Sequence, residues 1–322
     1  MTFNKLIKKI AVVTIALSII SSSLVSCGGS SSLENAYNPL SASGSVRLVH
    51  GFSQTVAVPS SDTIENSSVN GTLAESYISA NISLNSVNAA KNVYEQLYPA
   101  STTKILTCYI VATSCADLDE TLVVSDTAMR LEAGSSVCGL NVGDVISVRD
   151  ALYGMMLCSG NEAANALAEY VSGDISSFAD LMNDTARKLG ATSSHFTNAN
   201  GLHDENHYTT CYDLYLIFQK AIQNDTFYEI VTSKSYDASY KDASGGLVSK
   251  HWESTNRYLM GYEDSPKKVT VLGGKTGTTN AAGYCLVLLS ERKNGNRYVN
   301  IVLKAGSQED LYSLMNELLS VK

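Results

Sequence analysis

Ser101 and Lys104 stand three residues apart in the stretch YPASTTK, directly after a proline. In a helix this spacing places the two side chains one turn apart, so the lysine amine can reach the serine hydroxyl. A serine beside a base is a candidate nucleophile. The same stretch also fits an ordinary helix start, with Pro99 in the first turn and hydroxyls capping it. Other residues of the chain must decide between these readings.

Two further motifs follow in chain order. Ser-Gly-Asn at 159–161 stands between two predicted helices, where a loop can aim polar groups into a cleft. Lys-Thr-Gly at 275–277 ends a predicted strand, where Gly277 lets a substrate approach the backbone closely. With Ser-x-x-Lys, these are the elements of class A β-lactamases and penicillin-binding proteins. A decoy, SPKK at 265–268, has its serine before a proline in a predicted loop.

Longer stretches narrow the family: YPASTTKILT, CSGNEAANALAEYVSG, FTNANGLHDENHYTT and GGKTGTTNAAGYCLV. Over nearly all of residues 80–322 the chain resembles the serine-type D-alanyl-D-alanine carboxypeptidases, the low-molecular-weight penicillin-binding proteins. The resemblance implies a β-lactamase-like fold and an acyl-enzyme mechanism on the terminal D-Ala-D-Ala of peptidoglycan stem peptides, with β-lactam antibiotics as covalent inhibitors. Many relatives add a β-rich domain and an amphipathic helix, whereas we expect this chain to stop after the last helix of its catalytic domain.

Hydrolysing an amide requires a nucleophile, a proton acceptor, an oxyanion site and a handle on the carboxylate of the substrate. We expect Ser101 to be the nucleophile and Lys104 its base. Lys104 can accept a proton only if its pKa falls from ~10.4, which burial beside a second cation achieves. Lys275 is the expected second cation, so both amines should meet around the same hydroxyl oxygen. Lys275 would also hold the terminal carboxylate of the substrate.

The middle motif supplies the other two expected catalytic residues. Ser159 is placed to relay a proton to the departing D-alanine, and Asn161 to orient Lys104 and the substrate amide. A helix cap is a compatible structural role for both. The family pattern implies an oxyanion hole made by the backbone N–H groups of Ser101 and Thr278. The expected substrate-binding residues are Lys275, Thr276, Gly277 and Thr278.

Three other functions compete with this one. A class A β-lactamase shares the serine, but it needs a glutamate-positioned water, and no ExxLN segment is present. A metal-dependent D-Ala-D-Ala peptidase could use His203, Asp204 and His207, whose spacing is ligand-like, although they lie in a turn-rich stretch. A non-catalytic, wall-binding lipoprotein would keep the pocket without turnover. We expect no metal and no cofactor.

The first 26 residues have the pattern of an export signal, with lysines before an apolar run at Ile10–Ile20 that is too short to span a bilayer. The stretch LVSC resembles a bacterial lipobox, which implies cleavage before Cys27 and lipidation of that cysteine. An incidental cysteine after a plain secretory signal is the alternative. Two acyl chains would give durable attachment, so we expect the protein at the extracytoplasmic face of the bacterial cell membrane.

Composition sets the domain plan. The chain has 322 residues, of which 44% are hydrophobic and 17% charged, as expected for a globular protein. Residues 27–73 are rich in Ser, Asn and Gly and predict a flexible linker, and residues 74–322 form the catalytic domain. Loss of residues 1–26 removes three lysines and no acidic residue, which takes the formal charge from −8 to −11. This acidity argues against nucleic acid as a partner.

The secondary-structure pattern predicts strands at both ends of the domain. A short strand near Ile82–Leu84, a turn at Asn88–Lys91 and a strand at Asn92–Glu95 precede a helical middle part. Strands KVTVLGGK, AGYCLVLLSE and RYVNIVLKAG follow, with a hairpin turn at Asn294–Gly295, and an amphipathic helix at Leu311–Leu319 ends the domain. The prediction is an α/β (α+β) fold in which an antiparallel sheet is flanked by helices and carries a mainly helical subdomain. Helix-capping pairs begin at Ser147, Thr210 and Ser307.

Six cysteines follow the signal, and their spacings match no zinc or CxxC motif. Apolar runs such as ILTCYIV and GYCLVLL indicate small buried residues. The sequence leaves their disulfide state open. These residues are Cys108, Cys115, Cys138, Cys158, Cys211 and Cys285.

Overall fold

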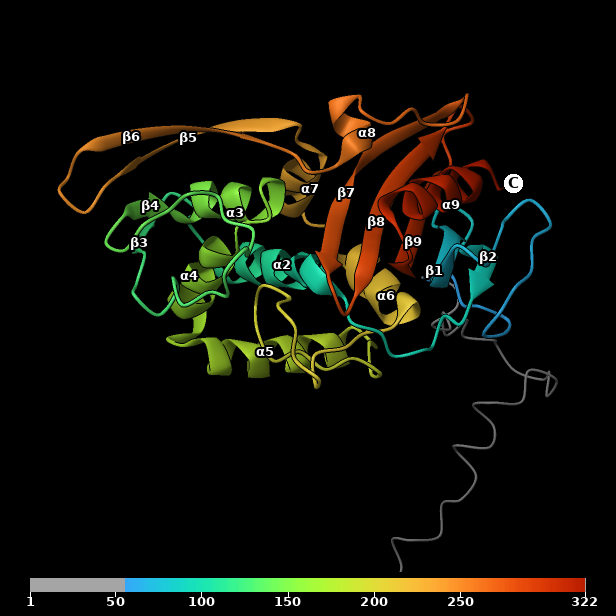
Figure 1. The fold of residues 1–322 in the computed structure, drawn as a ribbon, viewed down its shortest axis with the longest axis horizontal. Helices are drawn as coiled ribbons and strands as arrows, with labels where there is room; N and C mark the ends of the chain where they lie inside the picture. The colour runs from blue at the N-terminus through green and yellow to red at the C-terminus, as the bar shows by residue number, and fades with distance from the viewer. Residues whose placement is uncertain (1–55, 322) are drawn as a thin grey trace, which may run out of the picture. The chain divides into compact units, whose positions relative to one another are not determined.

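The computed structural model describes residues 56–321. The larger of two antiparallel sheets has five strands in the order β2-β1-β9-β8-β7 (Figure 1). Its strands come from opposite ends of the domain, which confirms the predicted mixed fold with a sheet closed by distant segments. These strands are β1 (Ala74–Asn81), β2 (Ser86–Lys91), β7 (Val269–Thr279), β8 (Gly283–Arg292) and β9 (Arg297–Ala305).

Side chains alternate between the two faces of this sheet, as the period of a strand requires. Leu286 and Leu288 pack with the helix α9 (Gln308–Ser320) on one face. Val287 and Leu289, from the same strand, belong to the main core on the opposite face, where the helical part of the domain packs. Both faces are therefore covered, and β8 reads as an almost continuous apolar run.

The middle of the chain forms most of the helices, and the three predicted caps are confirmed. The hydroxyls of Ser147, Thr210 and Ser307 accept the backbone N–H of the aspartate three residues later, each at 3.0 Å. A 3-10 turn, η2 (Ala100–Thr103), leads into the first of these helices. They are α2 (Lys104–Ser114), α3 (Val148–Leu157), α4 (Asn161–Ser172), α5 (Ile175–Lys188), α6 (Cys211–Ala221), α7 (Asp225–Thr232) and α8 (Arg257–Met260).

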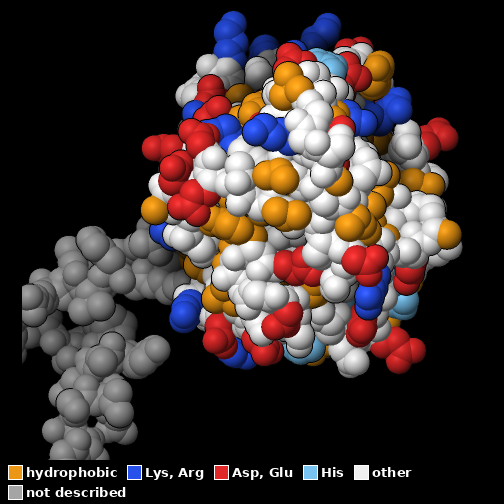
Figure 2. All heavy atoms as spheres, turned by 90° about the vertical axis from the view of Figure 1, so that its left-hand side faces the viewer, with side chains coloured by type: hydrophobic (Ala, Val, Ile, Leu, Met, Phe, Trp, Pro, Cys, Tyr) orange, Lys and Arg blue, Asp and Glu red, His pale blue; other side chains and the backbone are white. Residues whose placement is uncertain are grey.

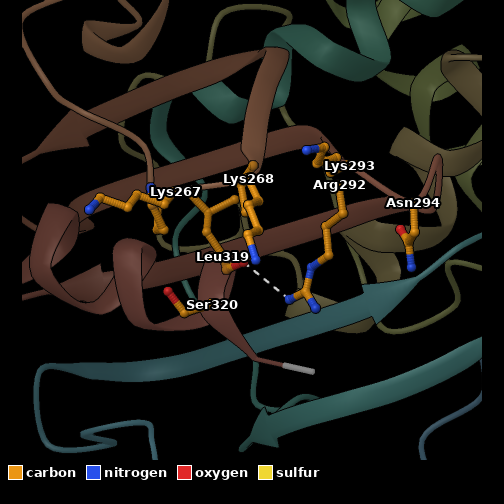
Figure 3. Close-up of a pocket in the computed structure, with 9 residues that line it drawn as sticks. Lys267, Lys268, Arg292, Lys293, Asn294, Leu319 and Ser320 are labelled. Atoms are coloured by element: carbon orange, nitrogen blue, oxygen red, sulfur yellow. Dashed lines mark hydrogen bonds between the residues drawn. The ribbon is translucent and has the colours of Figure 1, made fainter.

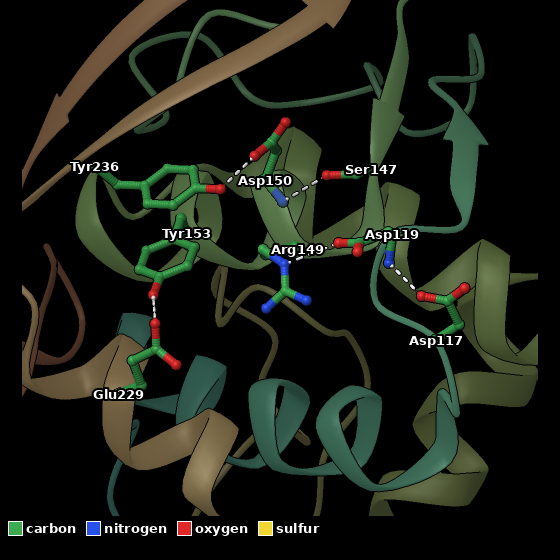
Figure 4. A network of polar contacts seen from close by, with 8 residues as sticks. All are labelled: Asp117, Asp119, Ser147, Arg149, Asp150, Tyr153, Glu229 and Tyr236. Carbon is green, nitrogen blue, oxygen red and sulfur yellow. Dashed lines mark hydrogen bonds and ion pairs between the residues drawn. The ribbon is translucent and has the colours of Figure 1, made fainter.

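A second sheet, of four strands in the order β3-β4-β5-β6, lies within this helical part and was not predicted. Its strands β5 and β6 form the long hairpin at the left of Figure 1. Figure 4 shows how the hairpin is fixed: Tyr236 of β5 donates to Asp150 of α3 at 2.6 Å and stacks on Tyr153, with ring centroids 3.7 Å apart. Tyr153 in turn donates to Glu229 of α7 at 2.9 Å. The strands are β3 (Thr121–Val123), β4 (Val145–Ser147), β5 (Ser235–Lys241) and β6 (Leu247–Glu253).

Figure 2 views the end of the domain that carries the hairpin. Acidic side chains are spread over this face, in keeping with the formal charge of −8, and apolar side chains lie among them. Scattered apolar side chains are normal on a soluble domain. In β3, in the loop between β3 and β4, and in β6, the large hydrophobic side chains that are exposed are Val123, Val137, Val142 and Leu247.

The predicted positions of the first strands are wrong. Residues 82–85 are a turn, because the side chain of Asn81 accepts the backbone N–H groups of Ser83 (3.0 Å) and Leu84 (3.1 Å). The expected turn at Asn88–Lys91 lies within β2, and Asn92–Glu95 is a turn rather than a strand. Asparagines explain these errors, since their short side chains favour turns and the left-handed conformation.

Part of the expected linker is folded onto the domain. The backbone N–H of Ala57 donates to the hydroxyl of Tyr215 at 2.8 Å, and Ile64 pairs with Ala90 of β2. A domain boundary at residue 73 is therefore too late. The expected signal peptide and Cys27 lie outside the described residues. Within residues 56–321, no helix combines the length and the apolar character needed to cross a bilayer.

Candidate active site

Ser101 lies in the tight turn η2 that precedes α2. The hydroxyls of Thr102 and Thr103 donate back to the carbonyls of Pro99 at 2.7 Å and Ala100 at 2.8 Å, which stabilises this turn. Ala100 has φ of 47°, a value that non-glycine residues rarely adopt. The turn presents Ser101, half-buried, at the start of the helix.

Lys104 begins α2 and is completely buried. Its Nζ lies 3.0 Å from Ser101 Oγ and 2.6 Å from each of two acceptors, Asn161 Oδ1 and the carbonyl oxygen of Asn200. Burial holds the pKa of Lys104 well below its usual value, and the charge of Lys275 lowers it further, whereas the carboxylate of Glu162 raises it. A lysine that is neutral near neutral pH can take a proton from the adjacent hydroxyl.

The Ser-Gly-Asn turn between α3 and α4 touches both lysines. Asn161 accepts from Lys104, and Ser159 Oγ lies 3.1 Å from the Nζ of Lys275. Ser159 has φ of 61°, so its backbone is strained, and such strain gathers at functional sites. The three motifs that stand apart in the sequence therefore meet in one place.

Lys275 lies within β7 and is 1% exposed. Its Nζ donates to the carbonyl of Thr276 at 2.8 Å in addition to the contact with Ser159. Burial lowers the pKa of Lys275 to about 7. The expectation that both lysine amines meet around one hydroxyl oxygen is wrong, because Lys104 contacts Ser101 and Lys275 contacts Ser159. The Ser-Gly-Asn turn joins the two pairs.

Gly277 allows β7 to pass directly against the turn that carries Ser101. A Cβ at this position would lie 2.9 Å from the backbone nitrogens of both Ser101 and Thr102, so a larger residue would push the strand away. Thr276 and Thr278 share one face of the strand, half-buried and exposed respectively. The hydroxyl of Thr276 lies 2.7 Å from that of Thr255, which follows β6.

Two residues at the site were missed from the sequence. Asn200 contacts Lys104 through its backbone carbonyl, and its side chain donates to Asn165 of α4 at 2.9 Å. Asn200 lies in the stretch FTNANGLHDENHYTT. Its residue type could not reveal this contact, because every residue has a backbone carbonyl that can accept a hydrogen bond. Glu162 directly follows the Ser-Gly-Asn motif and is completely buried, a position in which an acidic residue needs specific partners.

The geometry of His203, Asp204 and His207 does not support a metal site. The Nε2 of His207 lies 2.8 Å from Thr103 Oγ1, and its Nδ1 accepts the N–H of Thr197 at 3.1 Å, so both ring nitrogens are occupied. Burial lowers the pKa of His207 to about 3, so the ring is neutral. No cluster of three metal-binding side chains exists among the residues that the structure describes. His207 instead supports the turn that carries Ser101.

The sequence left open whether the six cysteines form disulfides. All six are free thiols in the described part of the chain. Cys108 and Cys285, in the apolar runs noted above, are completely buried, as predicted. Burial raises the pKa of Cys285 to about 12 and that of Cys108 further, so both behave as small apolar side chains.

The decoy SPKK lies at the opposite end of β7 from the Lys-Thr-Gly motif. Among residues 56–321, the hydrogen bond of the Ser265 hydroxyl goes to the carbonyl of Val269, at 2.8 Å, and not to a lysine amine. Lys268 lines a groove with Lys267 and Arg292, shown in Figure 3. Val269 of β7 pairs with Arg292 of β8. Val269 lies six residues before Lys275, which corresponds to about 20 Å along a strand. The three-residue spacing alone does not make a site.

The chain is similar to several known proteins. The model of the D-alanyl-D-alanine carboxypeptidase family matches residues 63–307. The D-alanyl-D-alanine carboxypeptidase DacF of Bacillus subtilis is 31% identical over 236 residues, which are 71% of this chain and 57% of the relative. DacC of Escherichia coli, of the same description, is 33% identical over 275 residues, 83% of this chain and 62% of the relative.

A solved structure agrees with these matches. The Streptomyces DD-transpeptidase has a TM-score of 0.70 with this chain at 29% identity, and the match covers 77% of this chain and 96% of that one. The chain spans only 57% and 62% of the two curated relatives named above. The family model nevertheless covers well over half of the chain. The chain therefore belongs to the D-alanyl-D-alanine carboxypeptidase family.

Proposed function

We propose that the protein is a serine D-alanyl-D-alanine carboxypeptidase, which removes the terminal D-alanine from peptidoglycan stem pentapeptides through an acyl-enzyme on Ser101. The observation that carries this proposal is the buried Nζ of Lys104, 3.0 Å from Ser101 Oγ. The names of the relatives support it, since two are carboxypeptidases of this specificity and one is a DD-transpeptidase.

Acylation begins when neutral Lys104 takes the proton of Ser101 as Oγ attacks the carbonyl carbon of the penultimate D-alanine. Negative charge then develops on the carbonyl oxygen, and the backbone N–H groups of Ser101 and Thr278 stabilise it. The close approach of β7 at Gly277 supports this placement of the two N–H groups. Asn161 keeps Lys104 in position, because its side-chain oxygen accepts from the amine.

The leaving D-alanine needs a proton on its nitrogen. Ser159 donates that proton as the C–N bond breaks. The ammonium group of Lys104, which holds the proton taken from Ser101, then returns a proton to Ser159 through the polar groups of the site. Water then attacks the ester carbon of the acyl-enzyme, with Lys104 again accepting a proton, and Ser101 regains its hydroxyl hydrogen. The peptide shortened by one residue departs.

Lys275 acts as the handle for the terminal carboxylate of the substrate. A cation with a pKa of about 7 in the free site is stabilised in its charged form when a carboxylate binds. Thr276 and Thr278, on one face of β7, assist with hydroxyl groups. β-Lactam antibiotics enter as covalent inhibitors, because they present an acyl group and a carboxylate in the same order.

The test is D-alanine release from a peptide ending in D-Ala-D-Ala. The proposal predicts release by the native chain, none by Ser101→Ala, and unchanged release in the presence of a chelator. Chelator-sensitive release would favour the metal-dependent alternative instead. A native chain that binds the peptide without releasing D-alanine would make it a wall-binding protein.

We also propose that the protein is a lipoprotein, anchored through Cys27 at the extracytoplasmic face of the cell membrane. The lipobox-like LVSC and the basic, apolar start of the chain support this anchor. Replacing Cys27 by Ser should move the protein from the detergent phase of a Triton X-114 extraction to the aqueous phase. Equal partition of both forms would rule out the lipid.

A further inference from the structure

Glu162 is a buried carboxylate that the proposed reaction leaves without a role. It lies in the first turn of α4, directly after Asn161, and is 0% exposed. Its Oε1 accepts three successive backbone N–H groups, from Cys138 at 2.7 Å, Gly139 at 2.8 Å and Leu140 at 3.3 Å. A buried charge persists only where such partners compensate it, and here all three belong to one loop.

The same loop touches the Ser-Gly-Asn turn at two more points. The carbonyl of Ser136 accepts the N–H of Asn161 at 2.9 Å. The Sγ of Cys138 packs against Gly160 so closely that a Cβ there would lie 2.8 Å from the sulfur. On its other side, the carbonyl of Cys138 accepts the indole N–H of Trp252 in β6 at 2.9 Å. The loop therefore packs between the Ser-Gly-Asn turn and the hairpin β5–β6.

We propose that Glu162 is a positioning residue, whose carboxylate fastens the loop at residues 136–140 against the Ser-Gly-Asn turn. This contact holds Ser159 in its strained backbone conformation and keeps Asn161 on the amine of Lys104. The inference rests on the proposed function of the same site. It predicts that breaking the fastening disturbs the chemistry more than it disturbs the fold.

The charge of Glu162 has a second consequence for Lys104. Of the charged groups that face this amine, Lys275 of β7 lowers its pKa, whereas Glu162 of α4 raises it, and the buried thiol of Cys138 stays uncharged because its own pKa is raised. His207, behind the nucleophile turn, is neutral, with a pKa of about 3. Removing the charge of Glu162 therefore lowers the pKa of Lys104 further, and the neutral base persists to lower pH.

Two substitutions separate the fastening from the charge. Glu162→Gln keeps an acceptor oxygen for the three amides but has no charge, and Glu162→Ala has neither. The matched control is Glu169→Gln, which makes the same charge change on the same helix. Glu169 accepts from the hydroxyl of Ser125 at 2.6 Å and does not contribute to the pKa shift of Lys104.

The measurements are the rate of Ser101 acylation by benzylpenicillin as a function of pH, and amide hydrogen exchange at residues 136–140. Glu162→Gln should move the acidic limb of the acylation rate to lower pH, and Glu169→Gln should leave it in place. Glu162→Ala should speed exchange of the loop amides by about tenfold or more and lower acylation at neutral pH by about 10²-fold.

A native acidic limb in Glu162→Gln together with native loop exchange in both Glu162 variants would overturn the inference. If Glu162→Ala does not fold, Glu162→Gln decides the question by its acidic limb and its loop exchange, because a neutral amide oxygen makes weaker hydrogen bonds than a carboxylate and its loop amides should exchange faster than those of the native chain. If the native chain is not acylated at Ser101, the proposed function fails. The exchange comparison between native chain and Glu162→Gln then decides the fastening by itself.

Discussion

The Nζ of Lys275 lies 3.1 Å from Ser159 Oγ, although the two residues are 116 positions apart in the chain. Ser159 belongs to the same short turn as Asn161, which accepts from Lys104 at 2.6 Å. The charge of Lys275 lowers the pKa of Lys104, while the pKa of Lys275 itself, about 7, is set mainly by burial. Burial and the charge of Lys275 both favour the neutral amine of Lys104, whereas burial alone acts against the charge of Lys275.

Lys104→Arg tests the role of the neutral amine. A guanidinium keeps a positive charge and hydrogen-bond donors but cannot lose its proton in this pH range. We expect D-alanine release to fall by about 10²–10⁴-fold, the contribution typical of a general base. The measurement is kcat/KM with a D-Ala-D-Ala peptide, and thermal unfolding shows whether the variant is folded. A folded variant with native kcat/KM would exclude Lys104 as the base.

Lys275→Ala tests the carboxylate handle. The native enzyme should prefer a peptide with a free C-terminal carboxylate over the same peptide with a C-terminal amide. The variant should lose this preference, with a KM for the free carboxylate higher by about 10–100-fold, because a charge-assisted hydrogen bond is removed. If the preference is unchanged, the carboxylate is held elsewhere.

The pH dependence of substrate binding follows from the same residue. Lys275 is charged below its pKa of about 7 and becomes neutral above it, so KM for the free carboxylate should rise as the pH increases through this range. Lys275→Arg stays charged, and its KM should stay flat to higher pH. The comparison needs KM measured from about pH 6 to pH 9 for both proteins. Identical profiles would contradict the assignment.

Gly277→Ala tests the close approach of β7 to the nucleophile turn. The added Cβ would lie 2.9 Å from the backbone nitrogen of Ser101, so the strand must shift by a few tenths of an ångström or more. We expect acylation and D-alanine release to fall together by about 10²-fold, as small misplacements in an active site do.

The control for Gly277→Ala is Gly245→Ala, at the tip of the hairpin. Gly245 has φ of +87° with no heavy atom within 4 Å of the added Cβ, so the substitution strains the backbone without touching the site. Its activity should stay native while its thermal stability falls slightly. A Gly277→Ala variant as active as this control would mean that the strand has room to move.

Short motifs with a fixed physical meaning were predicted well from the sequence. Lys104 reaches Ser101 because the spacing places them one turn apart, Lys275 reaches Ser159 from its place on β7, and the cap at Ser147 follows from local hydrogen bonding. Contacts through the backbone were invisible: any residue type at position 200 would offer the carbonyl that Lys104 uses.

The remaining errors come from tertiary context. The hairpin β5–β6 alternates between covered and exposed positions, but its covered positions include the small Ala238 and the charged Lys250, so the apolar signal for a strand is weak. Glu162 is charged in sequence and buried in the fold, because three amides from a distant loop converge on it. The strand β1 was missed because polar residues such as Ser76 and Ser79 are buried on it.

The account is tested most directly by the intact mass of the native chain after brief exposure to benzylpenicillin, followed over time. We expect one covalent adduct per chain that is lost slowly, no adduct on Ser101→Ala, and a native level of adduct on Ser265→Ala. Adduct formation on Ser101→Ala would contradict the account. Rapid loss of the adduct with full turnover of penicillin would identify a β-lactamase instead.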